Sequence, residues 1–360
     1  MVVDGTVDAP LDVVVEVAGF EARIVAPVHG GTVAAAVTVP DVSVWWPRGH
    51  GEQPLYDVRV SLASGGVDLD SWVRRTGFRN VSLSTQDDDA GMSFVIAVND
   101  QPVFVRGVNW IPDDCFVSRV GIDDYRERIS QAAAANVNLL RIWGGGLYEK
   151  DELYDVCDEM GILVWQDFLF ACAAYPETDD LVAEVEGEAR DNVARLMPHP
   201  SLVLWNGNNE NIWGFFDWGW QEPLDGKDWG LGYYTGVLPR VVAQTDPSRP
   251  YWPGSPYSGS LDIHPNDPDH GNHHSWEVWN RADYTSYAED RPRFVSEFGY
   301  QAPPRGRRWK RLWPTSLSSS IRRASCTTRR RTTATASLPG GWHRTSRTRS
   351  TPLTGTTSPS

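Results

Sequence analysis

Two short apolar segments each run into a glutamate, and these two glutamates have the types and spacing that could do chemistry. One segment reads Ser201-Leu-Val-Leu-Trp-Asn-Gly-Asn-Asn-Glu210, and the other places Glu297 directly after Phe-Val-Ser. Short apolar runs bounded by turn residues are typical of strands buried in a parallel sheet. Because catalytic groups of parallel barrels follow the C-terminal ends of strands, the pattern predicts both carboxyl groups in one pocket.

Two carboxyl groups in one pocket suit glycoside hydrolysis. One group, when protonated, donates to the leaving oxygen, and the other, when ionised, attacks the anomeric carbon. Asn208 and Asn209 precede Glu210 and offer amides for sugar hydroxyls, while Arg141, at the end of an earlier strand, is a candidate cation to orient Glu297. A separation of about 5 to 5.5 Å would predict retention of configuration. A single glutamate after a strand is more often a helix cap or an ion-pair partner, so the hypothesis rests on the pair.

The elements that must position this pair change character near residue 98. Residues 1–98 hold β-branched runs at 11–18, 32–39 and 56–62, which predict an antiparallel sandwich. Residues 99–303 alternate strands with helices and predict an α/β domain, a TIM barrel that lacks strand eight. The expected helices are 123–135, capped by Asp123, 149–160, ended by Gly161, and 180–197. The expected strands are 103–110, 138–143, 162–168, 202–205, 251–256, 261–264 and 293–296.

The separation of the two glutamates tests this arrangement. They are 87 residues apart, which is three βα units at about 30 residues each. Glu210 would then follow strand four and Glu297 strand seven. In a closed barrel of eight strands, these two ends face each other across the axis.

Aromatic and polar side chains gather near the predicted strand ends. Their apolar faces could stack on sugar C–H groups, or they could simply pack the core, which is the interpretation we favour for Trp165 and Trp205. Asp167 ends a strand, and binding a sugar hydroxyl and a structural role are equally supported. The Trp45-Trp46 pair is interpreted as packing between two domains. The other tryptophans of this group are Trp143, Trp213, Trp218, Trp276 and Trp279.

Charge and composition exclude several classes of function. Residues 304–360 contain twelve Arg, one Lys and no acidic residue, so the preceding residues are strongly acidic, which argues against a nucleic-acid partner. The Arg/Ser/Thr-rich tail predicts disorder or a shifted reading frame, with a nucleic-acid-binding tail as the alternative. We see no secretory signal and no apolar run long enough for a membrane span, and we expect a cytoplasmic protein. The cysteines fit free thiols of a reducing compartment: Cys115, Cys157, Cys172 and Cys326.

Two further motifs are weaker. The histidines His264, His270, His273 and His274 lack a zinc-binding pattern, and no metal is expected. The glycines 144–146 are not followed by the Lys-Ser/Thr pair of a phosphate-binding loop. We interpret them as backbone that makes room near the pocket.

The motifs around the two glutamates resemble those of glycoside hydrolase family 2. Asn208-Asn-Glu210 and Ser296-Glu-Phe-Gly299 are similar to its acid/base and nucleophile signatures. Within the family, several motifs in the same order resemble β-mannosidases, and the resemblance covers residues 10–303. These motifs are Gly107-Val-Asn-Trp-Ile-Pro112, Arg141-Ile-Trp-Gly-Gly-Gly146, Val164-Trp-Gln-Asp-Phe168, Trp205-Asn-Gly-Asn-Asn-Glu210 and Gly271-Asn-His-His-Ser-Trp276.

The resemblance implies a fold, a reaction and a set of site residues. It implies an immunoglobulin-like sandwich followed by a (β/α)8 barrel, and metal-free, retaining removal of terminal β-linked mannose from oligosaccharides. Glu210 would be the acid/base and Glu297 the nucleophile, Asn209 would hold the sugar 2-hydroxyl, and Trp143 would line the subsite. The remaining substrate-binding candidates are Arg141, Asp167, Trp218, His274 and Trp276.

Two alternatives stay open beside a β-mannosidase. One keeps the fold and changes the sugar, as in β-galactosidase, β-glucuronidase or exo-glucosaminidase. The other is a carbohydrate-binding fragment that has lost turnover. Members of the family also begin with a jelly-roll domain and complete an eighth strand, and the motifs of this chain match neither part.

Overall fold

An antiparallel sheet of four strands lies at the start of the chain. The computed structural model describes residues 10–26 and 36–300, so most of the predicted strand 32–39, Cys326 and the tail 304–360 lie outside the described residues. The strands β1 (Leu11–Val17), β2 (Phe20–Ala26), β3 (Tyr56–Ser64) and β4 (Val67–Thr76) pair in the order β2-β1-β3-β4. Leu11, Val13 and Leu62 form its small buried core. This sheet is consistent with the predicted β-sandwich.

Buried residues of the next strands pack into the main hydrophobic core, and the domain boundary expected at residue 98 stays a prediction. A three-stranded sheet of β5 (Val81–Ser84), β8 (Val95–Val98) and β9 (Gln101–Pro102) carries Phe94 beside it, and β6 (Asp87–Asp88) pairs with β7 (Gly91–Met92). The Phe94 ring centroid lies 5.7 Å from that of Trp165 and 5.2 Å from that of Trp252. Aromatic side chains dominate such cores because each buries a large apolar area.

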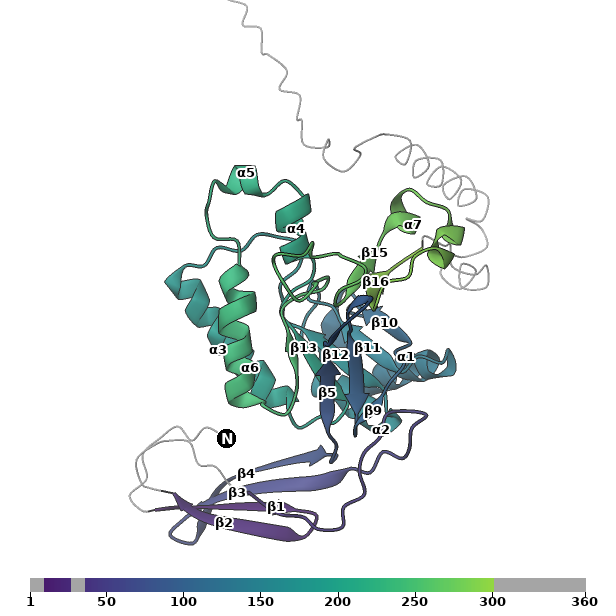
Figure 1. Ribbon diagram of the computed structural model, residues 1–360. Helices are drawn as coiled ribbons and strands as arrows, with labels where there is room; N and C mark the ends of the chain where they lie inside the picture. The colour runs from purple at the N-terminus through teal and green to yellow at the C-terminus, as the bar shows by residue number, and fades with distance from the viewer. Residues whose placement is uncertain (1–9, 27–35, 301–360) are drawn as a thin grey trace, which may run out of the picture. The chain divides into compact units, whose positions relative to one another are not determined.

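Five parallel strands form the main sheet, in the order β10-β11-β12-β13-β14. Every residue of β11, β12 and β13 is buried, as expected for strands covered on both faces. Figure 1 shows β11, β12 and β13 next to one another. The bounds are β10 (Gly107–Trp110), β11 (Leu139–Ile142), β12 (Leu163–Asp167), β13 (Leu202–Asn206) and β14 (Tyr251–Trp252).

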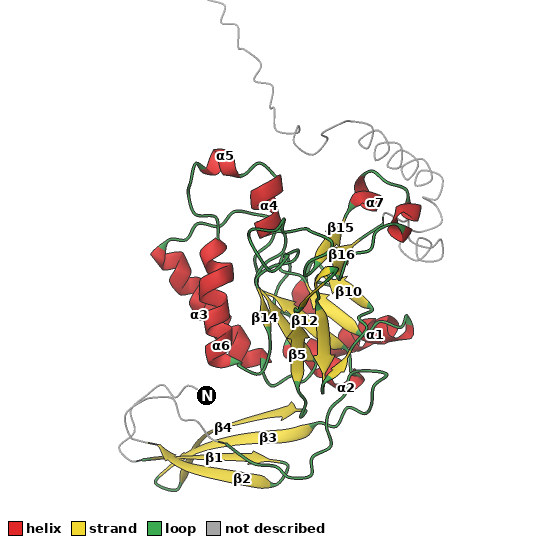
Figure 2. Ribbon diagram, in the orientation of Figure 1, coloured by secondary structure: helices red, strands yellow, loops and turns green. Residues whose placement is uncertain are grey.

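The predicted helices form close to their expected positions, and Figure 2 draws them in red. They are α1 (Ile122–Ala134), α2 (Asp151–Met160) and α3 (Asp179–Leu196), and α3 packs against α6 (Leu238–Thr245). Gly161 ends α2 with φ +68°, a left-handed conformation that suits glycine. The predicted cap Asp123 is wrong, since the N-cap is Gly121, whose N–H donates to Asp124. The remaining short helices are η1 (Val117–Arg119), α4 (Asn211–Asp217), α5 (Gln221–Leu224) and η2 (Tyr233–Val237).

Two later strands differ from the prediction. The segment 261–264 is a loop, and the strand after β14 is instead β15 (His273–Ser275), which pairs with β16 (Val295–Phe298). Among the described residues, neither joins the five-stranded sheet, so the closed barrel stays a prediction. None of the helices in the described ranges is long and apolar enough to cross a membrane.

Contacts divide the chain into two units, which we describe separately. The first holds residues 1–274 and 291–297, and the second holds residues 275–290 and 298–360. In the described part of the second unit lie α7 (Glu277–Asn280) and η3 (Tyr284–Ala288). There, Trp276 packs edge-on against Trp279 with ring centroids 5.7 Å apart.

Candidate active site

Glu210 lies in the turn between β13 and α4. Its φ is +63°, which is uncommon for a residue with a side chain, and its N–H donates to the carbonyl of Ser255 over 2.7 Å. The residue occupies the N-cap position of α4, but its carboxylate makes no capping hydrogen bond. Backbone contacts therefore fix the turn and leave the carboxylate available for another role.

Glu297 lies within β16, and the side chains of His274 and Arg141 face it. Its Oε2 lies 2.8 Å from His274 Nδ1 and 3.7 Å from Arg141 Nη1. Burial raises the pKa of Glu297, but His274 and Arg141 outweigh burial and bring the pKa down to about 2. The carboxylate is therefore ionised at neutral pH, as a nucleophile requires.

His274 brings the two glutamates together. Its Nδ1 is 2.9 Å from Glu210 Oε1, and the nearest ligand atoms of Glu210, His274 and Glu297 all lie within 4.8 Å of one another. A short separation of this kind is the arrangement of retaining glycosidases, whose carboxyl groups are about 5 to 5.5 Å apart. The two carboxyl groups are thus close to each other, while the catalytic roles themselves stay a prediction.

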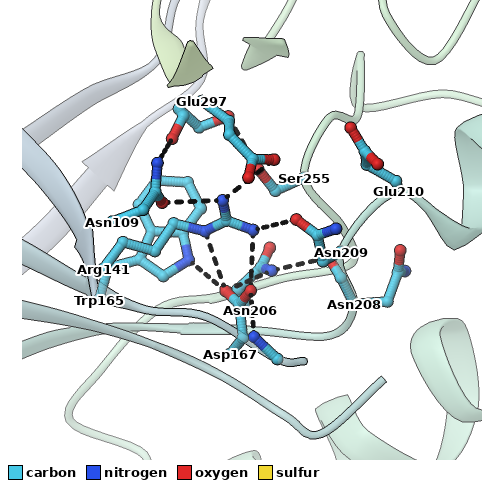
Figure 3. A network of polar contacts seen from close by, with 12 residues as sticks. Asn109, Arg141, Trp165, Asp167, Asn206, Asn208, Asn209, Glu210, Ser255 and Glu297 are labelled. Carbon is cyan, nitrogen blue, oxygen red and sulfur yellow. Dashed lines mark hydrogen bonds and ion pairs between the residues drawn. The ribbon is translucent and has the colours of Figure 1, made fainter. Parts of the chain in front are cut away.

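Arg141 is the hub of the polar network drawn in Figure 3. Its guanidinium donates to both carboxylate oxygens of Asp167, at 3.3 and 2.8 Å, and to the side-chain oxygens of Asn109 and Asn209, at 3.0 and 2.8 Å. Because these acceptors come from different segments of the chain, the guanidinium is held in one orientation. Arg141 is only 2% exposed, and its orienting of Glu297 stays a prediction.

Asp167 was a candidate either for binding a sugar hydroxyl or for a structural role, and its contacts favour the structural role. It is fully buried, and protein donors occupy both of its oxygens. Besides Arg141, its donors are the backbone N–H of Gly144 and the side chains of Trp165 and Asn206. A carboxylate so saturated has no free acceptor for a substrate. Asp167 therefore positions Arg141.

The two asparagines before Glu210 differ in role. The amide of Asn208 donates to the carbonyl of Pro253 and accepts from the N–H of Asn211, so it holds the turn together. Asn209 accepts from Arg141, and its amide N–H donates to Cys172 Sγ over 3.3 Å. The predicted contact of Asn209 with a sugar hydroxyl stays a prediction.

Cys172 is a site residue that sequence reasoning missed. Its thiol donates to Glu210 Oε2 over 3.3 Å, and its backbone N–H donates to the carbonyl of Asn209. The residue as a whole is exposed, but partial desolvation of its sulfur and the neighbouring Glu210 raise the pKa of the thiol to about 12. No spacing rule signals such a contact, because 38 residues separate the two side chains.

The tryptophans divide into core and candidate site residues. Trp165 and Trp205 are buried, as predicted. Trp218 packs against Trp213, whose ring centroid is 6.3 Å from that of His274. Trp143 is half-buried, and its indole N–H has no partner in the described part of the chain. Trp276 belongs to the second unit, and its predicted contact with the substrate stays a prediction.

The histidines at 264, 270 and 274 have different partners. His264 pairs with Asp217 and His270 pairs with Asp267, while His274 alone contacts the two glutamates. Within the described residues, the triads Asp155–Asp158–His199 and Glu210–His274–Glu297 have donor atoms close enough for one ion. In these triads, histidine Nδ1 lies 2.6 Å from Asp158 and 2.9 Å from Glu210, the distances of charge-assisted hydrogen bonds, and we interpret both as hydrogen-bonded clusters.

Comparison with known proteins identifies the group of sequences to which the chain belongs. Residues 3–79 match the sequence profile of the glycosyl hydrolases family 2. The chain is 37% identical over 293 residues to β-mannosidase B of Thermothelomyces thermophilus, an alignment that covers 76% of this chain and 33% of the relative. It is 38% identical over 283 residues to the β-mannosidase of Capra hircus, covering 73% of this chain and 31% of the relative. The chain thus spans about a third of the length of these relatives.

Solved structures agree with these relatives. The β-D-mannosidase of Dictyoglomus thermophilum superposes with a TM-score of 0.79 at 42% identity, over 86% of this chain and 38% of that one. The exo-chitosanase of Amycolatopsis orientalis superposes with a TM-score of 0.57 at 19% identity, covering 79% of this chain and 32% of that one, which shows a shared fold only. On these similarities, the chain is β-mannosidase-like and belongs to glycoside hydrolase family 2.

Proposed function

We propose that this chain carries the catalytic centre of a retaining, exo-acting β-mannosidase whose sheet closes into a (β/α)8 barrel with the remainder of the fold. The observation that carries the proposal is the meeting of two carboxylates in different surroundings. Glu297 faces His274 and Arg141, whereas Glu210 faces His274 and a thiol. The substrate class is a β-mannoside oligosaccharide, as the names of the relatives indicate.

The proposed reaction has two steps. In the first, ionised Glu297 attacks the anomeric carbon while Glu210 donates its proton to the leaving oxygen, which gives a covalent glycosyl-enzyme and the free alcohol. In the second, Glu210 takes a proton from water, and the resulting hydroxide displaces Glu297. Arg141 orients Glu297 throughout, Asn209 holds the sugar 2-hydroxyl, and Trp143 lines the subsite.

The distinguishing experiment uses the full chain and a panel of nitrophenyl β-glycosides. Turnover of the mannoside above the galactoside, glucuronide and glucosaminide is the expected result. Glu297→Gln and Glu210→Gln should each lower turnover by orders of magnitude, since each removes a group used in bond breaking. Glu186→Gln is the matched control, because Glu186 pairs with Arg190 and Arg240 on the surface.

A covalent label identifies the nucleophile. A 2-deoxy-2-fluoro-mannosyl fluoride slows the second step, so the peptide containing Glu297 should gain the mass of the fluorosugar. A label on another residue would overturn the assignment. If no glycoside is turned over but mannosides bind equally well to the chain and to its Glu210→Ala and Glu297→Ala variants, the chain is a carbohydrate-binding fragment instead.

A further inference from the structure

The ring of His274 is buried and has a polar partner on each side. Its Nδ1 faces the two glutamates, and its Nε2 lies 2.7 Å from the hydroxyl of Ser255. Ser255 is itself fully buried, and its carbonyl accepts the hydrogen bond from the N–H of Glu210. Ser255 therefore contacts both His274 and the backbone of the candidate acid/base.

Ser255, Ser296 and Asn272 form a chain of hydrogen bonds. The contacts of Asn272 fix which group donates at each step. The amide N–H of Asn272 donates to the carbonyl of Gly254 over 3.2 Å, which leaves the Asn272 Oδ1 as an acceptor. The hydroxyl of Ser296 donates to this Oδ1 over 2.8 Å, and its other contact, at 3.4 Å, is the carbonyl of His273. Both of these partners accept only, so the single hydroxyl hydrogen of Ser296 points away from Ser255.

The donor at each of these steps determines which nitrogens of His274 carry a hydrogen. Ser255 donates its hydroxyl hydrogen to Ser296 Oγ over 2.8 Å. A serine hydroxyl has one hydrogen, so only the lone pairs of Ser255 remain for His274, and Nε2 must carry a hydrogen. On the other side, Nδ1 lies 2.8 Å from Oε2 of Glu297, an ionised carboxylate that can only accept, and so Nδ1 also carries a hydrogen. Glu210 Oε1 lies 2.9 Å from the same nitrogen.

We propose that Asn272, Ser296 and Ser255 form a directed hydrogen-bond chain that keeps both ring nitrogens of His274 protonated, so that an imidazolium lies between the two candidate catalytic carboxylates. This inference rests on the proposed function and deepens it, since it makes Ser255 a positioning residue that acts through His274. The cation holds Glu297 ionised and fixes the place of Glu210.

The charged and titratable groups around the ring agree with a cation. Glu210 faces it from the turn after β13 and Glu297 from β16, while Arg141 lies beyond Glu297 and the Cys172 thiol beyond Glu210. Burial lowers the pKa of His274, but Glu297 and Glu210 outweigh burial, and the pKa is raised above its ordinary value.

The test is a histidine NMR titration of the full chain, which needs no turnover. The chain has eight histidines, and the His274 signals are assigned by their loss in His274→Asn. At pH 6, both ring nitrogens of His274 should carry a hydrogen. Ser255→Ala should lower the His274 pKa by about one unit, because a hydrogen bond to a charged donor is lost.

The matched control is Ser258→Ala. Ser258 is equally buried and lies on the same loop, but its hydroxyl donates to the carbonyls of Ser260 and Ile263. Its removal should leave the His274 pKa unchanged.

A ring with one protonated nitrogen at pH 6 in the unmutated chain would overturn the inference, even if Ser255→Ala did not fold. An equal effect of Ser255→Ala and Ser258→Ala would overturn it as well. A chain without mannosidase turnover would count against the proposed function and not against the imidazolium.

Discussion

Replacing Arg141 by methionine should destabilise the chain far more than an ordinary surface change. Methionine fills a similar volume but leaves Asp167 as an unpaired charge in a fully buried position. Breaking one side of a buried ion pair costs about 3 to 5 kcal/mol. Asp167 keeps hydrogen bonds from Gly144, Trp165 and Asn206, so we expect the lower end, about 3 kcal/mol, at pH 7.

The control is a second arginine–carboxylate pair, which lies at the surface. Arg240 forms a bidentate pair with Glu186, with both N–O distances 2.9 Å, and its side chain is 45% exposed. Water and salt screen such a pair, so Arg240→Met should change stability little. Urea unfolding, followed by tryptophan fluorescence, measures both free energies.

Equal losses for Arg141→Met and Arg240→Met would refute the reasoning, because Arg141 would then be hydrated rather than desolvated. A double-mutant cycle with Asp167→Asn isolates the pair itself. In that cycle, Asp167→Asn should recover part of the loss caused by Arg141→Met, since the uncompensated charge is gone.

Two further outcomes are expected from the same unfolding assay. The pKa of Glu297 falls from 4.5 to about 2 on folding, so its ionised form adds stability above pH 4.5 that is lost as the pH falls towards 2. As the pH falls from 4.5 towards 2, the free energy of unfolding of the unmutated chain should therefore decrease by up to about 3 kcal/mol more than that of Glu297→Gln. An equal decrease in both proteins would contradict this. Gly207→Ala places a Cβ 2.4 Å from the carbonyl oxygen of Pro253 and should destabilise by about 1 to 3 kcal/mol. Gly187→Ala, in α3 with open space around it, should stabilise by up to about 1 kcal/mol, and a loss at both glycines would show that the packing argument fails.

The sequence predicted the parts of the fold that are governed by local pattern. The continuous apolar runs of β11, β12 and β13 formed the buried strands expected of them, because a strand covered on both faces needs no polar alternation. Gly161 ended α2 because a left-handed residue at that position favours glycine. Arg141 was paired with Glu297 from strand order alone, and the structure places them 3.7 Å apart.

The errors arose where contacts between distant segments decide the structure. The segment 261–264 looked like a strand, but local bonds from the Ser258 hydroxyl to the carbonyls of Ser260 and Ile263 fold it as a loop. Asp167 offered a carboxylate at a strand end, and no local pattern showed that four neighbouring groups would saturate it. Residues 81–98 precede the predicted domain boundary, and no local pattern showed that Phe94 would pack on Trp165 and Trp252.

The two carboxylates differ because of the strands that supply their neighbours. β11 brings the guanidinium of Arg141 to Glu297, and β15 brings His274 to both glutamates. Glu210, which leaves β13 in a left-handed turn, gains instead the thiol of Cys172, a weak and uncharged donor. Glu297 therefore has two basic neighbours, Arg141 and His274, and Glu210 has only His274. This difference suits a nucleophile and a proton donor, because the nucleophile must stay ionised while its neighbour gains and loses a proton. The order of the strands therefore supports the roles proposed for Glu297 and Glu210, independently of the motifs in which they lie.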